Sequence, residues 1–162
     1  MVELLIIYVI TSTLLSTFKE IKVELLPIRS FSVMVPPGIY VLGDPCYTVP
    51  DKDWHKLLKS CDYFNTPIGE VNGHKILGFS TMYGDGTYRG SDGKSYPVDA
   101  GLIGLVPYVY AAPTVRDNRA IVQLVKFDYN TLCTRSQEGS LQFGSITINT
   151  ADDNFDDKEE DE

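Results

Sequence analysis

A chain of 162 residues with 43% hydrophobic and 22% charged residues is long enough for one domain with a substantial core, and it is unlike a disordered or fibrous protein. The net charge of -8 is concentrated at the end of the chain, since residues 151–162 hold eight acidic residues and one lysine. The rest is almost neutral, with 14 acidic and 13 basic residues, and has no basic stripe to neutralise phosphates. Nucleic acid is therefore not an expected partner.

Residues 151–162 (ADDNFDDKEEDE) are expected to be a disordered acidic tail, because they hold too few apolar residues to order themselves. Such a tail either keeps the protein soluble or engages a basic surface on a partner, and both interpretations stay open. The three cysteines form no paired spacing, which favours reduced thiols in a cytosol over a disulfide framework.

The first 33 residues are expected to be an accessory extension of strands. The apolar run Leu4–Phe18 is interrupted by Ser and Thr and is short for a membrane span. It also lacks a basic flank and a small-residue cleavage site, so a strand is favoured over a membrane or signal segment. Ile21–Leu26 (IKVELL) alternates apolar and polar residues as a half-buried strand does. The break at Pro36–Gly38 is compatible with a boundary near residue 34.

Two short strands and a helix are predicted next. The strands cover residues 31–35 and 39–42, and Gly43-Asp44-Pro45 ends the second one. The helix is predicted over 51–60, because an apolar stripe recurs at helical spacing, formed by Trp54, Leu57, Leu58 and Cys61. Asp51 and Asp53 suit the positive end of its dipole.

The remainder is predicted to be β-rich. Ile68–Leu77 has the pattern of a hairpin with Asn72-Gly73 as its turn, and Phe79–Tyr83 is expected to continue the second strand. Further strands are predicted at 95–98, 102–106, 120–127 and 141–149. The expected fold is an α+β, mostly antiparallel β, compact single domain over 34–150, with seven to nine short strands and one main helix.

The stretch GIYVLGDPCYTVPDKDWHKLL (38–58) contains residue types that can do chemistry. A nucleophilic Cys46 needs a nearby base, but His55 lies off the apolar stripe and is expected in solvent, so Cys46 is expected to be a small packed residue. Cys46, His55 and Cys61 lack metal-ligand spacing, and Gly84–Thr87 lacks the lysine of a phosphate-binding loop. No catalytic residue, metal site or cofactor is predicted.

The turn aspartates leave an enzyme as the alternative. Asp44, Asp85 and Asp99 either converge to serve a small hydrolase or nucleotide-binding enzyme, or they bond their local backbone as turn formers. The many tyrosines between residues 40 and 110 likewise indicate either a binding surface or packing on strand faces.

Three ordered motifs carry a resemblance to known proteins: GIYVLGDPCY at 38–47, GDGTY at 84–88 and VDAGLIG at 98–104. They resemble elements of small phage and bacterial proteins, mostly without assigned function, to which no catalytic residues attach. In size, acidic tail and general character the chain is also similar to the Lon protease inhibitors of T-even phages. That resemblance implies a phage-encoded, non-enzymatic interaction protein in the host cytoplasm. It would inhibit a host enzyme, an ATP-dependent Lon-type protease. From the short, interrupted apolar run at residues 4–18, no membrane partner is expected.

In this interpretation, turns and strand edges present Tyr and Asp side chains to the host protein. The expected partner-binding residues are Asp44, Tyr47, Asp85, Tyr88 and Arg89.

Overall fold

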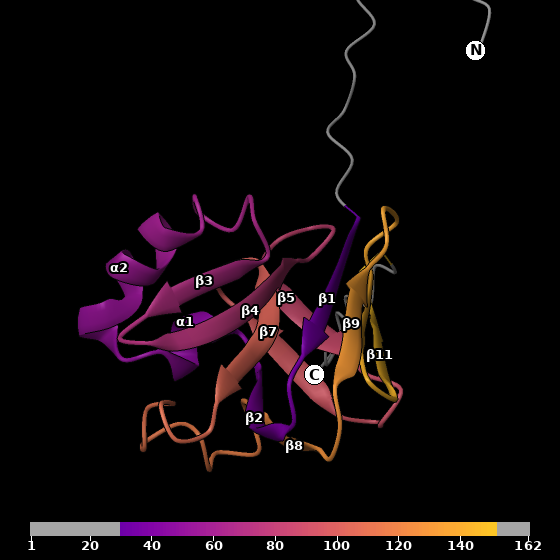
Figure 1. The fold of residues 1–162 in the computed structure, drawn as a ribbon. Helices are drawn as coiled ribbons and strands as arrows, with labels where there is room; N and C mark the ends of the chain where they lie inside the picture. The colour runs from indigo at the N-terminus through magenta and orange to yellow at the C-terminus, as the bar shows by residue number, and fades with distance from the viewer. Residues whose placement is uncertain (1–29, 152–162) are drawn as a thin grey trace, which may run out of the picture.

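The computed structural model describes residues 30–151, which form eleven strands and two helices (Figure 1). The helices are α1 (Pro45–Thr48) and α2 (Asp51–Ser60). The strands are β1 (Phe31–Val35), β2 (Gly38–Gly43), β3 (Ile68–Val71), β4 (His74–Ser80), β5 (Gly86–Arg89), β6 (Ser95–Val98), β7 (Leu102–Pro107), β8 (Gln123–Phe127), β9 (Thr131–Arg135), β10 (Ser140–Phe143) and β11 (Ile146–Asn149).

The strands form two larger sheets and one ribbon, all antiparallel. One sheet has the order β1-β9-β10-β11, the other has the order β3-β4-β7-β2-β8, and β5 pairs with β6. The α+β class and the antiparallel pairing are therefore confirmed, with more strands than the seven to nine expected. No helix within residues 30–151 is long and apolar enough to cross a membrane.

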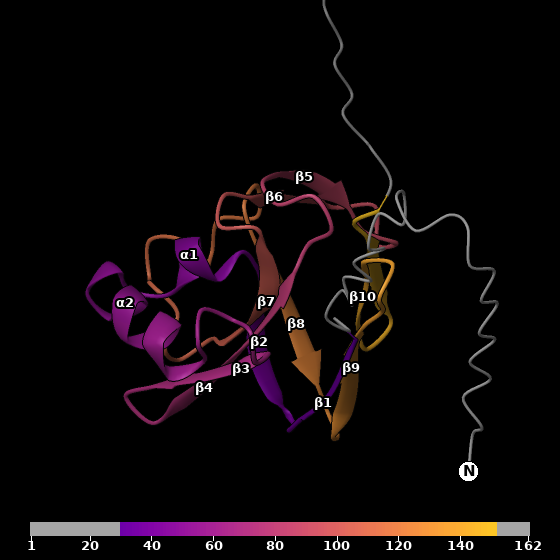
Figure 2. The same cartoon turned by 90° about the horizontal axis from the view of Figure 1, so that it is seen from above.

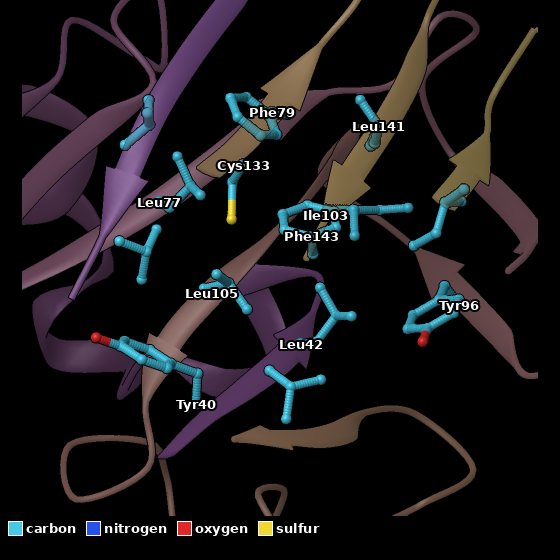
Figure 3. Packing of buried hydrophobic residues seen from close by; sticks show 14 of the residues in the cluster. Tyr40, Leu42, Leu77, Phe79, Tyr96, Ile103, Leu105, Cys133, Leu141 and Phe143 are labelled. Carbon is cyan, nitrogen blue, oxygen red and sulfur yellow. The ribbon is translucent and has the colours of Figure 1, made fainter. Parts of the chain in front are cut away.

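The five-stranded sheet lies between two hydrophobic clusters. On one face it packs against the four-stranded sheet, and Figure 3 shows Leu42, Phe79 and Leu105 meeting Cys133 and Phe143 from that sheet. On the opposite face it packs against α2 and its neighbouring loops (Figures 1 and 2). The result is three layers, in which each face of the central sheet buries its own set of alternating apolar residues.

Helix α2 has the bounds that the sequence predicts. Leu57 and Cys61 are buried and Trp54 and Leu58 pack against the same cluster, so the predicted stripe faces the central sheet. The ring of Trp54 lies 6.5 Å from that of Phe64. The expectation that His55 faces solvent is confirmed, because its side chain is exposed.

The hairpin at β3 and β4 is also confirmed, with positive φ at Asn72 (51°) and Gly73 (78°). The single strand predicted over residues 141–149 is wrong. Gly144 adopts φ 61°, and the chain reverses there to pair β10 with β11. Strands β5 and β9 are absent from the sequence prediction, because turn residues surround the first and polar residues dominate the second.

Several expected features lie outside the described residues. These are the apolar run at 4–18, the alternating segment at 21–26, and the acidic tail after Ala151. Strand β1 begins at Phe31, so residues 31–33 belong to the four-stranded sheet.

Candidate functional site

Three turns far apart in the sequence meet at one end of the central sheet. The first follows β2 at Asp44, the second connects β4 to β5, and the third connects β6 to β7. The backbone N–H of Thr81 donates to the carbonyl of Gly101 at 2.9 Å, which joins the second turn to the third. The carboxylate of Asp44 joins the first turn to the third through two further hydrogen bonds.

Asp44 is the central polar group of this arrangement. Pro45 holds it in an extended conformation, with φ -71° and ψ 122°, at the start of α1. Its Oδ1 accepts a hydrogen bond from the N–H of Cys46 at 2.9 Å, and its Oδ2 accepts from the N–H groups of Asp99 and Ala100 at 2.8 and 2.7 Å. The residue is fully buried. Asp44 therefore acts as a structural acceptor and does not reach the surface.

Cys46 and Tyr47 are half-buried beside Asp44. Burial raises the pKa of the Cys46 thiol far above its ordinary value, and the negative charge of Asp44 raises that pKa further. A thiol that stays protonated is a weak nucleophile. Burial also raises the pKa of Tyr47, with the charge of Asp99 as the next cause and Asp85 as a smaller one. The structure thus brings the three turn aspartates of the enzyme hypothesis around Cys46 and Tyr47.

The second turn is held from inside by two hydroxyl groups. The Oγ1 of Thr81 accepts a hydrogen bond from the N–H of Gly84 at 2.9 Å, and Tyr88 donates its hydroxyl to the Gly84 carbonyl, also at 2.9 Å. Tyr88 is buried, with 6% of its surface exposed, and it belongs to the hydrophobic cluster between the two sheets. Its hydroxyl therefore supports the turn from the side of the core. Tyr83 and Asp85 are exposed on the outside of the same turn.

The five expected partner-binding residues therefore occupy three kinds of position. Asp44 and Tyr88 lie under the surface, Tyr47 and Asp85 reach it at the turns, and Arg89 is exposed at the far end of β5. Arg89 is three residues beyond Gly86, roughly 10 Å along the strand.

Sequence reasoning about partner binding does not select Tyr83 or Asp99. Tyr83 stands next to the glycines of its turn, and Asp99 is near Tyr47 only through the fold. We define the acidic turn surface as the side chains of Tyr47, Tyr83, Asp85 and Asp99. Its two carboxylates are both exposed, and one aromatic ring is half-buried while the other is exposed.

A second buried carboxylate has a structural explanation. Asp53 accepts hydrogen bonds from the Tyr110 hydroxyl at 2.8 Å, from Asn72 Nδ2 at 2.9 Å and from Lys56 Nζ at 3.1 Å. The bond from Tyr110 is the main reason that the pKa of Asp53 is lowered. Burial and the contact with Asp53 raise the pKa of Tyr110 to about 12. The network ties α2 to the hairpin turn and to the segment after β7.

His74 stacks on Tyr110 with ring centroids 4.6 Å apart, next to the Asp53 network. Within residues 30–151 no group of three or more His, Cys, Asp or Glu residues is arranged to hold a metal ion.

No protein-family model matches the chain, and comparisons with curated proteins and with solved structures return no match.

Proposed function

We propose that this protein is a non-enzymatic interaction protein that binds a host protein through the acidic turn surface. The resemblance of the sequence to phage inhibitors makes an ATP-dependent Lon-type protease in the host cytoplasm the proposed target. One observation carries the proposal: backbone hydrogen bonds to the buried carboxylate of Asp44, together with the bond from Thr81 to Gly101, join the three turns that expose two tyrosines and two aspartates.

The chemistry of the surface suits a basic protein partner. Tyrosine is enriched in protein interfaces because its ring buries a large area while its hydroxyl keeps a polar contact. Exposed carboxylates attract a basic surface and accelerate the encounter. Asp85 and Asp99 supply this charge, and Tyr83 is 57% exposed beside them. The acidic tail carries charge of the same sign and would add to the attraction.

The turns are also rigid, which lowers the cost of binding. Hydrogen bonds from the backbone of Cys46, Asp99 and Ala100 to Asp44 fix two turns before any partner arrives. The Thr81 hydroxyl fixes the turn between β4 and β5. A surface that is already ordered loses less conformational entropy on binding than a flexible loop.

A small hydrolase or nucleotide-binding enzyme is the second candidate, and one observation favours it. The charges of Asp44, Asp85 and Asp99 all act on the thiol of Cys46, so the three carboxylates lie near one another. Two features weigh against it, however. Both oxygens of Asp44 already accept backbone hydrogen bonds, and Cys46 is held in its protonated form.

Inhibition of a purified Lon-type protease tests the proposal directly. We expect the full chain to slow ATP-dependent degradation of a fluorescent protein substrate. Asp85→Asn should raise the half-inhibitory concentration about tenfold, which corresponds to about 1.4 kcal/mol. Glu70→Gln is the matched control, because it removes the same charge from an exposed position on β3. If the full chain does not inhibit the protease, the proposed target is wrong. If the two variants inhibit equally well, the acidic turn surface does not bind the protease.

The enzyme alternative is tested with the same protein. Alanine variants at positions 44, 85 and 99 are assayed against panels of nucleotides and phosphoesters. A hydrolytic activity that is lost in Asp85→Ala, while the circular dichroism spectrum is unchanged, would support the enzyme and contradict the proposed non-enzymatic role. Turnover that is identical in the wild type and Asp85→Ala would point to a contaminant.

A further inference from the structure

Strand β1 has one open edge. Among the strands of residues 30–151 it pairs only with β9, so the peptide groups along its other edge have no strand partner there. Natural proteins usually cover such an edge, because it would otherwise pair with other chains. Residues 1–29 lead directly into this strand, which begins at Phe31.

An apolar groove runs beside this edge. It has a volume of about 330 Å³, and its lining is mostly apolar, with Val33, Val35, Tyr40 and Leu77 among its residues, although His74 and Lys75 also line it. Leu77, Leu105 and Tyr40 belong to the cluster between the two sheets (Figure 3), so the groove continues the core toward the surface. Ile68 pairs with Leu77 across β3 and β4, yet it is 38% exposed. The groove therefore offers an apolar wall to a further strand next to β1.

We propose that Ile21–Leu26 forms an antiparallel strand on the open edge of β1 and fills this groove with its apolar side chains. The segment alternates apolar residues, Ile21, Val23 and Leu25, with the charged residues Lys22 and Glu24. This is the period of a strand with one buried and one solvated face.

The pattern selects one register. Pairing Leu25 with Phe31, Val23 with Val33 and Ile21 with Val35 places all three apolar residues on the core face of β1. The reason is that directly opposite residues in an antiparallel pair lie on the same face. Shifting the register by one residue would turn Lys22 and Glu24 into the groove.

The connection that this register requires is also suitable. Residues 27–30 would form a four-residue loop, which is within the usual range for hairpins. Pro27 lies in this loop, where its missing N–H removes no bond from the ladder. On the outer face Lys22 would lie opposite Met34, which is 58% exposed.

An engineered disulfide in the full chain tests the register. Lys22→Cys combined with Met34→Cys places two thiols directly opposite on the outer face, at a Cα separation of roughly 5 Å that permits a disulfide. Glu24→Cys with Met34→Cys is the control, since a two-residue offset puts the Cα atoms roughly 8 Å apart. We expect mild oxidation to link the first pair at least about tenfold faster, as measured by peptide mass spectrometry.

Two results of this experiment would overturn the proposal. Equal rates for both pairs would show that the segment has no fixed register beside β1. A disulfide between two chains would show that a second copy covers the edge. Neither outcome depends on the proposed binding of a host protein.

Hydrogen exchange gives a second measurement. In the full wild-type chain we expect protected amides in residues 21–26 and on the open edge of β1. Val23→Glu should lose that protection while α2 keeps its own, which shows that the domain remains folded. Glu24→Gln, on the outer face, should leave the protection unchanged. Unprotected amides throughout residues 21–26 of the wild type would contradict the proposal.

Discussion

Replacing Asp44 should destabilise the fold by an amount that depends on how many hydrogen-bond acceptors the new side chain keeps. The buried carboxylate accepts one bond from Cys46 on Oδ1 and two, from Asp99 and Ala100, on Oδ2. An asparagine side chain at this position would keep one carbonyl oxygen, which is best placed where two donors converge. Asp44→Asn then loses the bond from Cys46, and a hydrogen bond to a charged group contributes about 1.5–3 kcal/mol.

Asp44→Ala removes all three acceptors. Adding three such bonds overstates the loss, because Asp99 and Ala100 are exposed and water can reach their amides once the carboxylate is gone. We therefore expect Asp44→Ala to lower the free energy of unfolding by about 3–5 kcal/mol. Asp44→Asn should lower it by about 1.5–3 kcal/mol. Asp99→Asn changes only an exposed side chain and should stay within about 0.5 kcal/mol of the wild type.

Urea unfolding followed by the fluorescence of Trp54, the single tryptophan, measures all three variants. The expected order of destabilisation is Asp44→Ala, then Asp44→Asn, then Asp99→Asn. If Asp44→Ala lies within about 0.5 kcal/mol of the wild type, the carboxylate does not hold the turns together. The inference that hydrogen bonds to Asp44 order the acidic turn surface before a partner binds would then be wrong.

Three other predictions concern single side chains. Alkylation of Cys46 should be much slower than in the unfolded chain at the same pH, because burial raises the pKa of its thiol; equal rates would contradict this. Tyr110→Phe should move acid unfolding to higher pH. The lowered pKa of Asp53 contributes stability above the unfolded value, near 4, that is lost as the pH falls through the folded value. An unchanged acid midpoint would count against that network. Gly78→Ala would place a Cβ 2.5 Å from Phe64 Cε1 and should cost about 1–3 kcal/mol in urea unfolding.

The parts of the fold that local chemistry determines can be predicted from the sequence. The bounds of α2 follow from an apolar stripe at helical spacing, and the hairpin of β3 and β4 follows from Asn72-Gly73 between apolar flanks. The turn at Gly144 escapes prediction because alternation continues on both sides of it and hides the reversal. Strand β9 escapes prediction because its pairing with β1 is a long-range contact that its own polar residues do not indicate.

The candidate site is harder to predict for the same reason. The turn at Asp44 is recognisable locally, from the glycine and proline beside it, but its contact with Asp99 spans 55 positions in the sequence. The sequence places Tyr88 at a surface, but its side chain is buried and its hydroxyl supports Gly84. Turn residues identify where a chain bends, and only the packing of several turns determines which side chains remain exposed.

Most of the chemically reactive side chains between residues 38 and 58 are buried or hydrogen-bonded within the fold. Asp44 satisfies three backbone donors, Cys46 is held as a neutral thiol, and Asp53 accepts three side-chain hydrogen bonds. A buried carboxylate whose oxygens are already occupied cannot also polarise a substrate, so its contribution to function is the geometry that it imposes on its neighbours. Together with the hydrogen bond from Thr81 to Gly101, that geometry brings Asp85 and Asp99 to one exposed surface beside the half-buried Tyr47. The surface that we propose for partner recognition therefore consists of side chains around Asp44, whereas Asp44 itself contributes to the stability of the fold.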